Sequence, residues 1–236
     1  MQKIITLTFI VFISLGLRAQ SLLPTKYGIK LGSNIGNIVS KANDGVENLD
    51  NSRLIGVFGG FYMEIALNDK WYINPELIYT QKGGSFTYNY QHDYQVNERD
   101  LHKTEHELKL TYIELNPTVS HKANEKISLN FGPSISYLFQ PVYNILSDTG
   151  ENENDPLHEE LPDAEYNEET LDFGINIAIS YYLTENFLIE TKVNTGLMST
   201  GEISKTIYTE NNGNDTRSNI YTIKNRGISF SLGYLF

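Results

Sequence analysis

The stretch LDFGINIAISY, residues 171–181, decides the fold of this chain. Its odd-numbered positions carry a large apolar side chain, and its even-numbered positions carry a small or polar one. Successive side chains of a β-strand point to opposite faces, whereas an amphipathic helix needs apolar residues at i, i+3 and i+4. The stretch therefore predicts a strand with one apolar face.

The same period of two recurs along the chain, most clearly over residues 27–35, 127–139 and 228–236. We predict eight strands, at residues 25–38, 53–67, 71–83, 108–122, 126–140, 170–183, 187–200 and 221–236. The small or polar set of each strand consists mostly of Gly, Ser, Asn and Thr with a few charges. This pattern predicts an all-β chain.

Connections between the predicted strands alternate between short and long. The short ones are residues 68–70, 123–125 and 184–186, and the long polar ones are about 39–52, 84–107, 141–169 and 201–220. A soluble sandwich has no reason to keep all its long loops at one end, whereas an outer-membrane barrel has tight periplasmic turns and long external loops. The predicted fold is an eight-stranded antiparallel transmembrane β-barrel, an up-and-down meander of the OmpA/OmpX size.

The composition of the two faces indicates which one meets lipid. A soluble barrel would turn its apolar side chains inward and place charges outside. Here the small and polar residues that alternate with the apolar ones carry too few charges for the exterior of a soluble protein. They suit the interior of a narrow barrel. Aromatic residues near the strand ends predict two interfacial girdles, although Tyr and Phe are also good strand formers: Tyr27, Trp71, Tyr72, Tyr79, Tyr137, Phe139, Tyr181, Tyr182, Phe187 and Phe236.

The N-terminus has the pattern of a secretory signal peptide. Lys3 provides the positive region, an apolar run follows, and Ala19 precedes the expected cleavage at Gln20. The alternative, an N-terminal membrane anchor, is disfavoured because the run of about 14 residues falls short of the roughly 20 that a spanning helix needs. We therefore predict a signal peptide over residues 1–19 and a barrel domain over residues 20–236.

Composition narrows the function classes further. The formal net charge is −11, which disfavours nucleic acid as a partner because phosphate binding needs a basic surface. The chain has no cysteine, which excludes disulfides, thiolate metal sites and a lipid-anchored lipoprotein. Mean hydropathy is −0.33, and after the signal no apolar run reaches the length of a membrane helix.

Several short segments carry a resemblance to a known family: the Ala19-Gln20 signal end, YGIKLG at 27–32, INPELIY at 73–79, YIELNP at 112–117, and residues 227–236. With them the chain resembles the PorT-like outer-membrane β-barrel family over essentially its whole mature length. The resemblance implies a small barrel in the cell outer membrane, in contact with lipid and lipopolysaccharide. The family's namesake takes part in type IX protein secretion, which implies envelope or secretion proteins as further partners.

The last strand carries a second resemblance. Its outward set, Phe230, Leu232, Tyr234 and Phe236, resembles the C-terminal signal that the outer-membrane barrel-assembly machinery reads. We expect this strand to pair with the first one and close the barrel, because unpaired backbone groups in lipid are costly.

Six charged residues fall on the inward positions of predicted strands: Lys30, Glu64, Glu76, Glu114, Glu190 and Lys192. An eight-stranded barrel is just wide enough for side chains to fill it, and buried charges there need partners. The sequence therefore predicts a structural salt-bridge network that plugs the lumen. A gated ion or proton path is the functional alternative, and Glu76 with Glu114 as an acid/base pair is a third reading.

Two further groups of residues are weaker candidates for chemistry. His102 and His106 have the i, i+4 spacing of a helical metal site but lie in a predicted external loop. Acidic residues crowd the stretch from Asp148 to Asp172, which indicates a solvated segment with divalent-cation capture as the alternative. We predict no catalytic, cofactor-binding or metal-binding residue.

These observations favour a structural or interaction barrel of the cell envelope with a mostly plugged lumen and long external loops. A narrow, porin-like transport channel is the alternative. A lipid-modifying enzyme embedded in the outer leaflet is a third class, and it would need a Ser, a His and an acid converging at the membrane rim.

Overall fold

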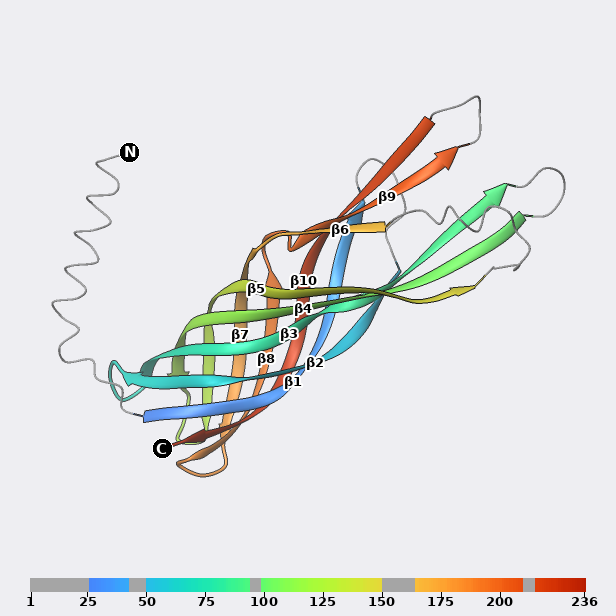
Figure 1. Cartoon of the computed structure of the whole chain (residues 1–236). Coiled ribbons are helices and arrows are strands. Elements are labelled where there is room, and N and C mark those ends of the chain that lie inside the picture. Colours follow the sequence, from blue (N-terminus) through green and yellow to red (C-terminus); the bar gives the residue numbers. More distant parts are fainter. Residues whose placement is uncertain (1–25, 43–49, 94–98, 150–163, 210–214) are drawn as a thin grey trace, which may run out of the picture.

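A computed structural model describes residues 26–42, 50–93, 99–149, 164–209 and 215–236 (Figure 1). The strands are β1 (Lys26–Ala42), β2 (Asp50–Ala66), β3 (Trp71–Asp93), β4 (Arg99–Lys122), β5 (Ile127–Thr149), β6 (Ala164–Glu168), β7 (Leu171–Tyr182), β8 (Phe187–Gly196), β9 (Gly201–Thr209) and β10 (Asp215–Leu235). Within these ranges, no helix is long and apolar enough to cross a membrane. The predicted signal peptide lies outside the described residues.

Eight of these strands close into a ring. The order is β1–β2–β3–β4–β5–β7–β8–β10, and β10 pairs back onto β1 in antiparallel register from Gly28↔Leu235 to Ala42↔Tyr221. At the end of this seam, the Phe236 amide donates to the Tyr27 carbonyl at 2.8 Å. The predicted fold class, an all-β antiparallel meander with an eight-stranded ring, is confirmed.

β-Structure continues beyond the ring at the end opposite the C-terminus (Figure 1). β3 and β4 stay paired up to Asp93↔Arg99, and β9 pairs with the outer part of β10 while β6 pairs with β9. The prediction that residues 84–107 and 201–220 are loops was therefore wrong for most of their length. A hairpin that leaves the apolar medium needs no apolar face, so the period-two signal fades although strand pairing continues.

Each short connection is stabilised by its own side chain. Asn68 Oδ1 accepts hydrogen bonds from the amides of Lys70 and Trp71, both at 3.0 Å. Asn124 and Thr184 hold the next two turns in the same way, at residues 123–127 and 183–187. An Asn or Thr oxygen that caps the amides two and three positions ahead fixes a tight turn, which explains why these three connections are short.

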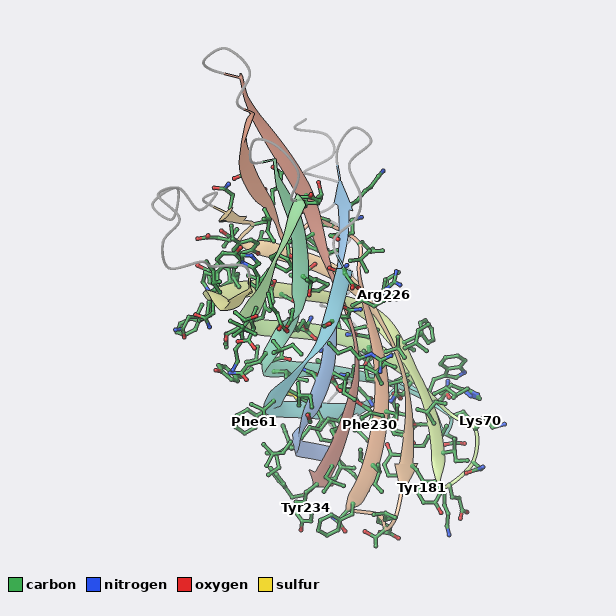
Figure 2. The ribbon with its side chains drawn as sticks, turned by 90° about the vertical axis from the view of Figure 1, so that its right-hand side faces the viewer. Phe61, Lys70, Tyr181, Arg226, Phe230 and Tyr234 are labelled. Atoms are coloured by element: carbon green, nitrogen blue, oxygen red, sulfur yellow. The ribbon has the colours of Figure 1, made fainter. Side chains whose placement is uncertain are left out.

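The two faces of the ring differ as the alternation predicts. Along β7 exposed and buried residues alternate without interruption, and Ile177 is 62% exposed while Asn176 is 1% exposed. Figure 2 shows side chains such as Phe61, Phe230 and Tyr234 on the outside of the ring. A continuous apolar exterior of this size must be covered by an apolar medium, which makes the outer face a lipid-facing surface.

The aromatic residues separate by face. Most of the predicted girdle residues are exposed on the outer face, among them Tyr27 and Trp71 at the start of their strands and Tyr137 in the middle of β5. Tyr182 is different because it is buried in the lumen, and Tyr72 is partly buried, with Lys122 Nζ 4.0 Å from its ring centroid. These two were wrongly assigned to the girdles, since their even-numbered positions place them on the inward face.

A charge on the outer face should be costly in proportion to its depth. We expect Ile177→Arg to lose about 2–4 kcal/mol of folding free energy near the bilayer midplane. Ser180→Arg should instead act inside the lumen, where Ser180 Oγ donates to Glu190 Oε2 at 2.9 Å. Urea titration of both variants in lipid vesicles, with Ile177→Leu as control, measures the difference. Wild-type stability of Ile177→Arg would contradict the assignment of this face to lipid.

Candidate functional site

Four of the six predicted lumenal charges form one compact ion-pair network at the centre of the ring. Lys30 Nζ of β1 donates to Glu76 Oε1 of β3 at 2.5 Å and to Glu190 Oε2 of β8 at 2.8 Å. Lys192 Nζ, also on β8, donates to Glu76 Oε2 at 2.5 Å and lies 3.6 Å from Glu190 Oε1. Two lysines thus alternate with two carboxylates. All four side chains are at most 7% exposed.

This arrangement follows from strand geometry. Glu190 and Lys192 are two residues apart on β8, so both point to the same face. Lys30 and Glu76 lie on strands separated only by β2, which contributes glycines at positions 59 and 60. In a ring of eight strands, side chains this long meet across the axis.

Amide and hydroxyl groups donate further hydrogen bonds to the network, except at Glu190 Oε1, whose only charged contact among the described residues is the Lys192 ammonium 3.6 Å away. Asn116 Nδ2 donates to Glu76 Oε2 at 3.3 Å and to Glu114 Oε1 at 2.9 Å. On the opposite wall, Asn130 Nδ2 and Ser180 Oγ both donate to Glu190 Oε2. Buried charges are tolerated when hydrogen bonds accompany their pairing, and these neutral groups provide them.

Glu114 belongs to a second pair that the sequence analysis missed. Its carboxylate contacts Lys82 Nζ of β3 and accepts a hydrogen bond from Ser136 Oγ at 2.9 Å. Lys82 lies within the predicted strand 71–83 and has the inward parity of Glu76. The signal that identified the other charges was therefore sufficient to find it.

Glu64 lies apart from the others, near the turn-bearing end of the ring. Its carboxylate accepts a hydrogen bond from the Tyr182 hydroxyl at 2.6 Å, and Lys122 Nζ lies 3.8 Å away. Lys122 was also missed, although its parity matches that of Glu114. Tyr62 and Tyr182 pack here with Leu188 and Leu235 in a buried cluster, which we call the inner cap.

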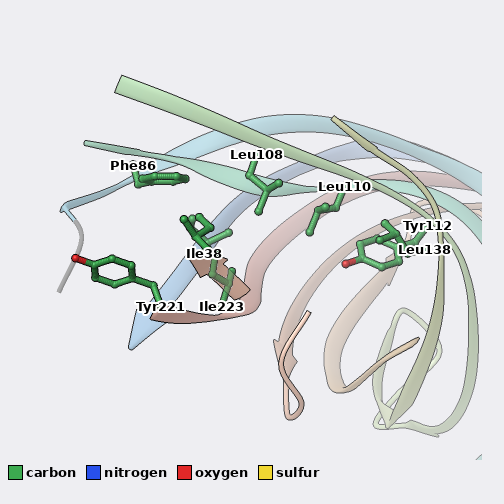
Figure 3. Packing of buried hydrophobic residues seen from close by; sticks show 9 residues of the cluster. Ile38, Phe86, Leu108, Leu110, Tyr112, Leu138, Tyr221 and Ile223 are labelled. Carbon is green, nitrogen blue, oxygen red and sulfur yellow. The ribbon is translucent and has the colours of Figure 1, made fainter. Parts of the chain in front are cut away.

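A larger apolar cluster closes the opposite end and is called the outer cap (Figure 3). Its members come from β1, β3, β4, β5, β9 and β10: Ile38, Phe86, Leu108, Leu110, Tyr112, Leu138, Ile203, Tyr221 and Ile223. At its edge, the ring of Phe86 stacks on that of His106 with centroids 5.0 Å apart, and the Tyr143 hydroxyl lies 2.8 Å from His106 Nδ1. The ionic network is thus enclosed between two apolar layers.

The structure also bears on the other candidate chemistries. Glu76 and Glu114 are linked through Asn116, but each carboxylate is engaged by lysine, which removes the free base that acid/base work needs. His102 and His106 lie on strand β4 and not on a helix, so their Cα atoms are roughly 13 Å apart. Within the described ranges no cluster of His, Asp and Glu could hold a metal ion. Most of the acidic stretch lies outside those ranges.

Residues 18–202 match the family described as the outer membrane protein beta-barrel domain. The chain belongs to this family. It is accordingly a β-barrel of the Gram-negative outer membrane, with lipid and lipopolysaccharide as its surroundings. No curated protein matches it.

Solved structures similar to the barrel include three other outer-membrane proteins. OprG from Pseudomonas aeruginosa is 12% identical, with a TM-score of 0.44 over 92% of this chain and 98% of that one. The protease OmpT from Escherichia coli is 15% identical, with a TM-score of 0.44 over 92% and 98%. Neisserial surface protein A is 10% identical, with a TM-score of 0.43 over 89% and 97%.

Removing one carboxylate from the network should be strongly destabilising. We expect Glu76→Gln to cost about 3–5 kcal/mol, because Lys30 and Lys192 would then share Glu190 alone in a buried site. The measurement is the free energy of unfolding in detergent or lipid. Glu125→Gln, on an exposed turn, serves as the control and should stay within ~0.5 kcal/mol of wild type. Equal unfolding midpoints for the two variants would show that the network contributes no stability.

Proposed function

We propose that the protein is a non-conducting barrel that serves as a structural or interaction protein of the cell envelope. The observation that carries this proposal is the filled lumen, in which paired charges lie between the inner and outer caps. A sealed barrel can anchor a partner that its external strands bind, but it conducts no solute.

An ion would meet two kinds of barrier in this lumen. It would first cross the outer cap, where Ile38, Leu108 and Leu110 are fully buried, and apolar constrictions block conduction by excluding water. It would then have to displace Lys30 or Lys192 from carboxylates that contact them at 2.5–2.8 Å. Both steps oppose the narrow-channel alternative.

The external hairpins are the part of the molecule suited to contact. β3–β4 and β9–β10 extend beyond the ring, and exposed segments on a rigid scaffold commonly carry function. The resemblance to the PorT-like family supports a protein partner in the envelope, and a secretion apparatus is the specific partner we propose. Residues 1–19 are proposed to be a signal peptide that delivers the chain to the periplasm.

Recordings in planar bilayers test the sealed lumen. The purified barrel should produce no steady conductance at neutral pH, because the caps and the ion pairs stay in place, whereas a general porin in the same membranes provides the positive control. Heat-dependent migration on SDS gels confirms that the added protein is folded. Regular conductance steps from the folded wild-type barrel would overturn the proposal and favour the narrow channel.

Assembly should depend on the last strand. We propose that Phe230, Leu232, Tyr234 and Phe236 form the signal for the barrel-assembly machinery, and they are exposed on the strand that closes the ring. Deletion of residues 234–236 should leave the protein in the periplasm or degraded, because both the signal and the closing hydrogen bonds are lost.

The matched control is deletion of residues 152–162 from the acidic stretch, which should leave assembly intact because external segments tolerate changes in length. Cell fractionation with protease digestion of whole cells gives the readout. Normal outer-membrane levels of the tail deletion would contradict the proposed role of the last strand.

A further inference from the structure

Three cations lie together on the outer face of the β10–β1 seam. They are Lys41 of β1 and Lys224 and Arg226 of β10, and all three are exposed. Register places Arg226 opposite Asn37 and Lys224 opposite Val39, with Lys41 one step further along the seam. Since residues on one face of neighbouring strands lie about 5–8 Å apart, these cations form one cluster, called the basic patch.

The basic patch begins where the lipid-facing surface ends. The outward residues of β10 run upward as Phe236, Tyr234, Leu232, Phe230 and Ile228, and the next outward residue is Arg226. Eight residues of a tilted strand rise by roughly 20 Å, close to the height of the apolar band of an outer-membrane barrel. Figure 2 shows Arg226 well away from Tyr234, which lies beside the turn-bearing end. The patch therefore sits at the headgroup level of the external leaflet.

The three cations are available for a ligand. Within the described ranges none of them forms an ion pair, although the chain is strongly acidic overall. Lys224 Nζ donates to the Leu197 carbonyl at 2.8 Å, which leaves two of its three donors unused and fixes its position on the surface. Exposed acids occupy the adjoining outer strands, including Glu168 of β6 and Glu202 of β9. The basic patch is thus a positively charged region of a chain that is acidic overall.

An apolar surface adjoins the patch. Leu197 is 53% exposed and Met198 is 51% exposed beside Lys224, and Ile228 continues the apolar surface directly below Arg226. A ligand that fits both features has anionic groups at headgroup level and hydrocarbon beneath them. A phosphorylated, multiply acylated lipid of the external leaflet has this layout, whereas a soluble acidic protein has no use for the apolar part.

We propose that the basic patch binds the phosphate groups of lipid A, the membrane anchor of lipopolysaccharide. Arg226 pairs with phosphate oxygens through its planar guanidinium, and Lys224 and then Lys41 extend the positive charge outward along the seam. The acyl chains lie along the apolar surface below Arg226, which begins at Ile228. This site orients the barrel in the external leaflet and does not depend on whether the lumen conducts.

The test measures binding of purified lipid A to the folded barrel in nanodiscs of zwitterionic lipid, with EDTA present to remove bridging divalent cations. Three probes are compared: bisphosphorylated lipid A, the same lipid A without phosphates, and inorganic phosphate. Wild type should prefer the phosphorylated lipid by about 100-fold, since each cation near an anionic headgroup contributes roughly fivefold. Inorganic phosphate at millimolar concentration should not compete, because it lacks the acyl chains.

The patch variant replaces Lys41, Lys224 and Arg226 with Gln. Its control replaces Lys26, Lys70 and Lys126 with Gln, which removes the same charge at the turn-bearing end. The patch variant should lose the preference for phosphorylated lipid A, whereas the control should keep it, and heat-modifiable migration checks the fold of both. Equal binding by the two variants, or no preference in wild type, would overturn the proposal. Competition by free phosphate would show a simple anion site instead.

Discussion

The rest of the structure depends on one constraint, which is that a backbone amide or carbonyl in hydrocarbon must find its hydrogen-bond partner within the protein. The β1–β10 pairing meets this requirement by leaving the ring without a free edge. Closing with only eight strands makes the interior narrow, so side chains fill it and any charge there must be paired. The pairing of Lys30 and Lys192 with Glu76 and Glu190 therefore follows from the closure of the ring.

Where a large side chain extends across the narrow interior, the facing position on the neighbouring strand must carry a small residue. A Cβ at Gly28 would lie 2.4 Å from the Tyr62 ring, and one at Gly32 would lie 2.7 Å from the Phe58 ring. β1 therefore supplies two inward positions without side chains, and aromatic rings from β2 occupy that space. The inner cap depends on this complementarity, because Tyr62 could not lie across the lumen if position 28 carried a side chain.

Period-two alternation predicted the ring well because the bilayer imposes it on every spanning strand. The same parity placed all six expected charges in the lumen, and it applies equally to Lys82, Lys122 and Asp172, which the sequence analysis did not include. Period-two alternation did not predict the outer hairpins. Outside the bilayer a strand needs no lipid-facing apolar set, so the alternation weakens in the outer part of β3 although Phe86 is buried in the outer cap. Which carboxylate pairs with which lysine also depends on strand register across the ring, which one sequence does not specify.

Charge is distributed differently inside the lumen and in the rest of the chain. The described lumenal groups nearly cancel, with Lys30, Lys82, Lys122 and Lys192 against Glu64, Glu76, Glu114, Glu190 and Asp172. Their sum is one negative charge, so most of the net charge of −11 is carried elsewhere. Cancellation inside is required by the low dielectric, whereas the outer segments face water and tolerate an acidic excess. An acidic exterior beside an anionic leaflet would be repelled from it, and the β10–β1 seam is where exposed cations at the boundary offset that repulsion.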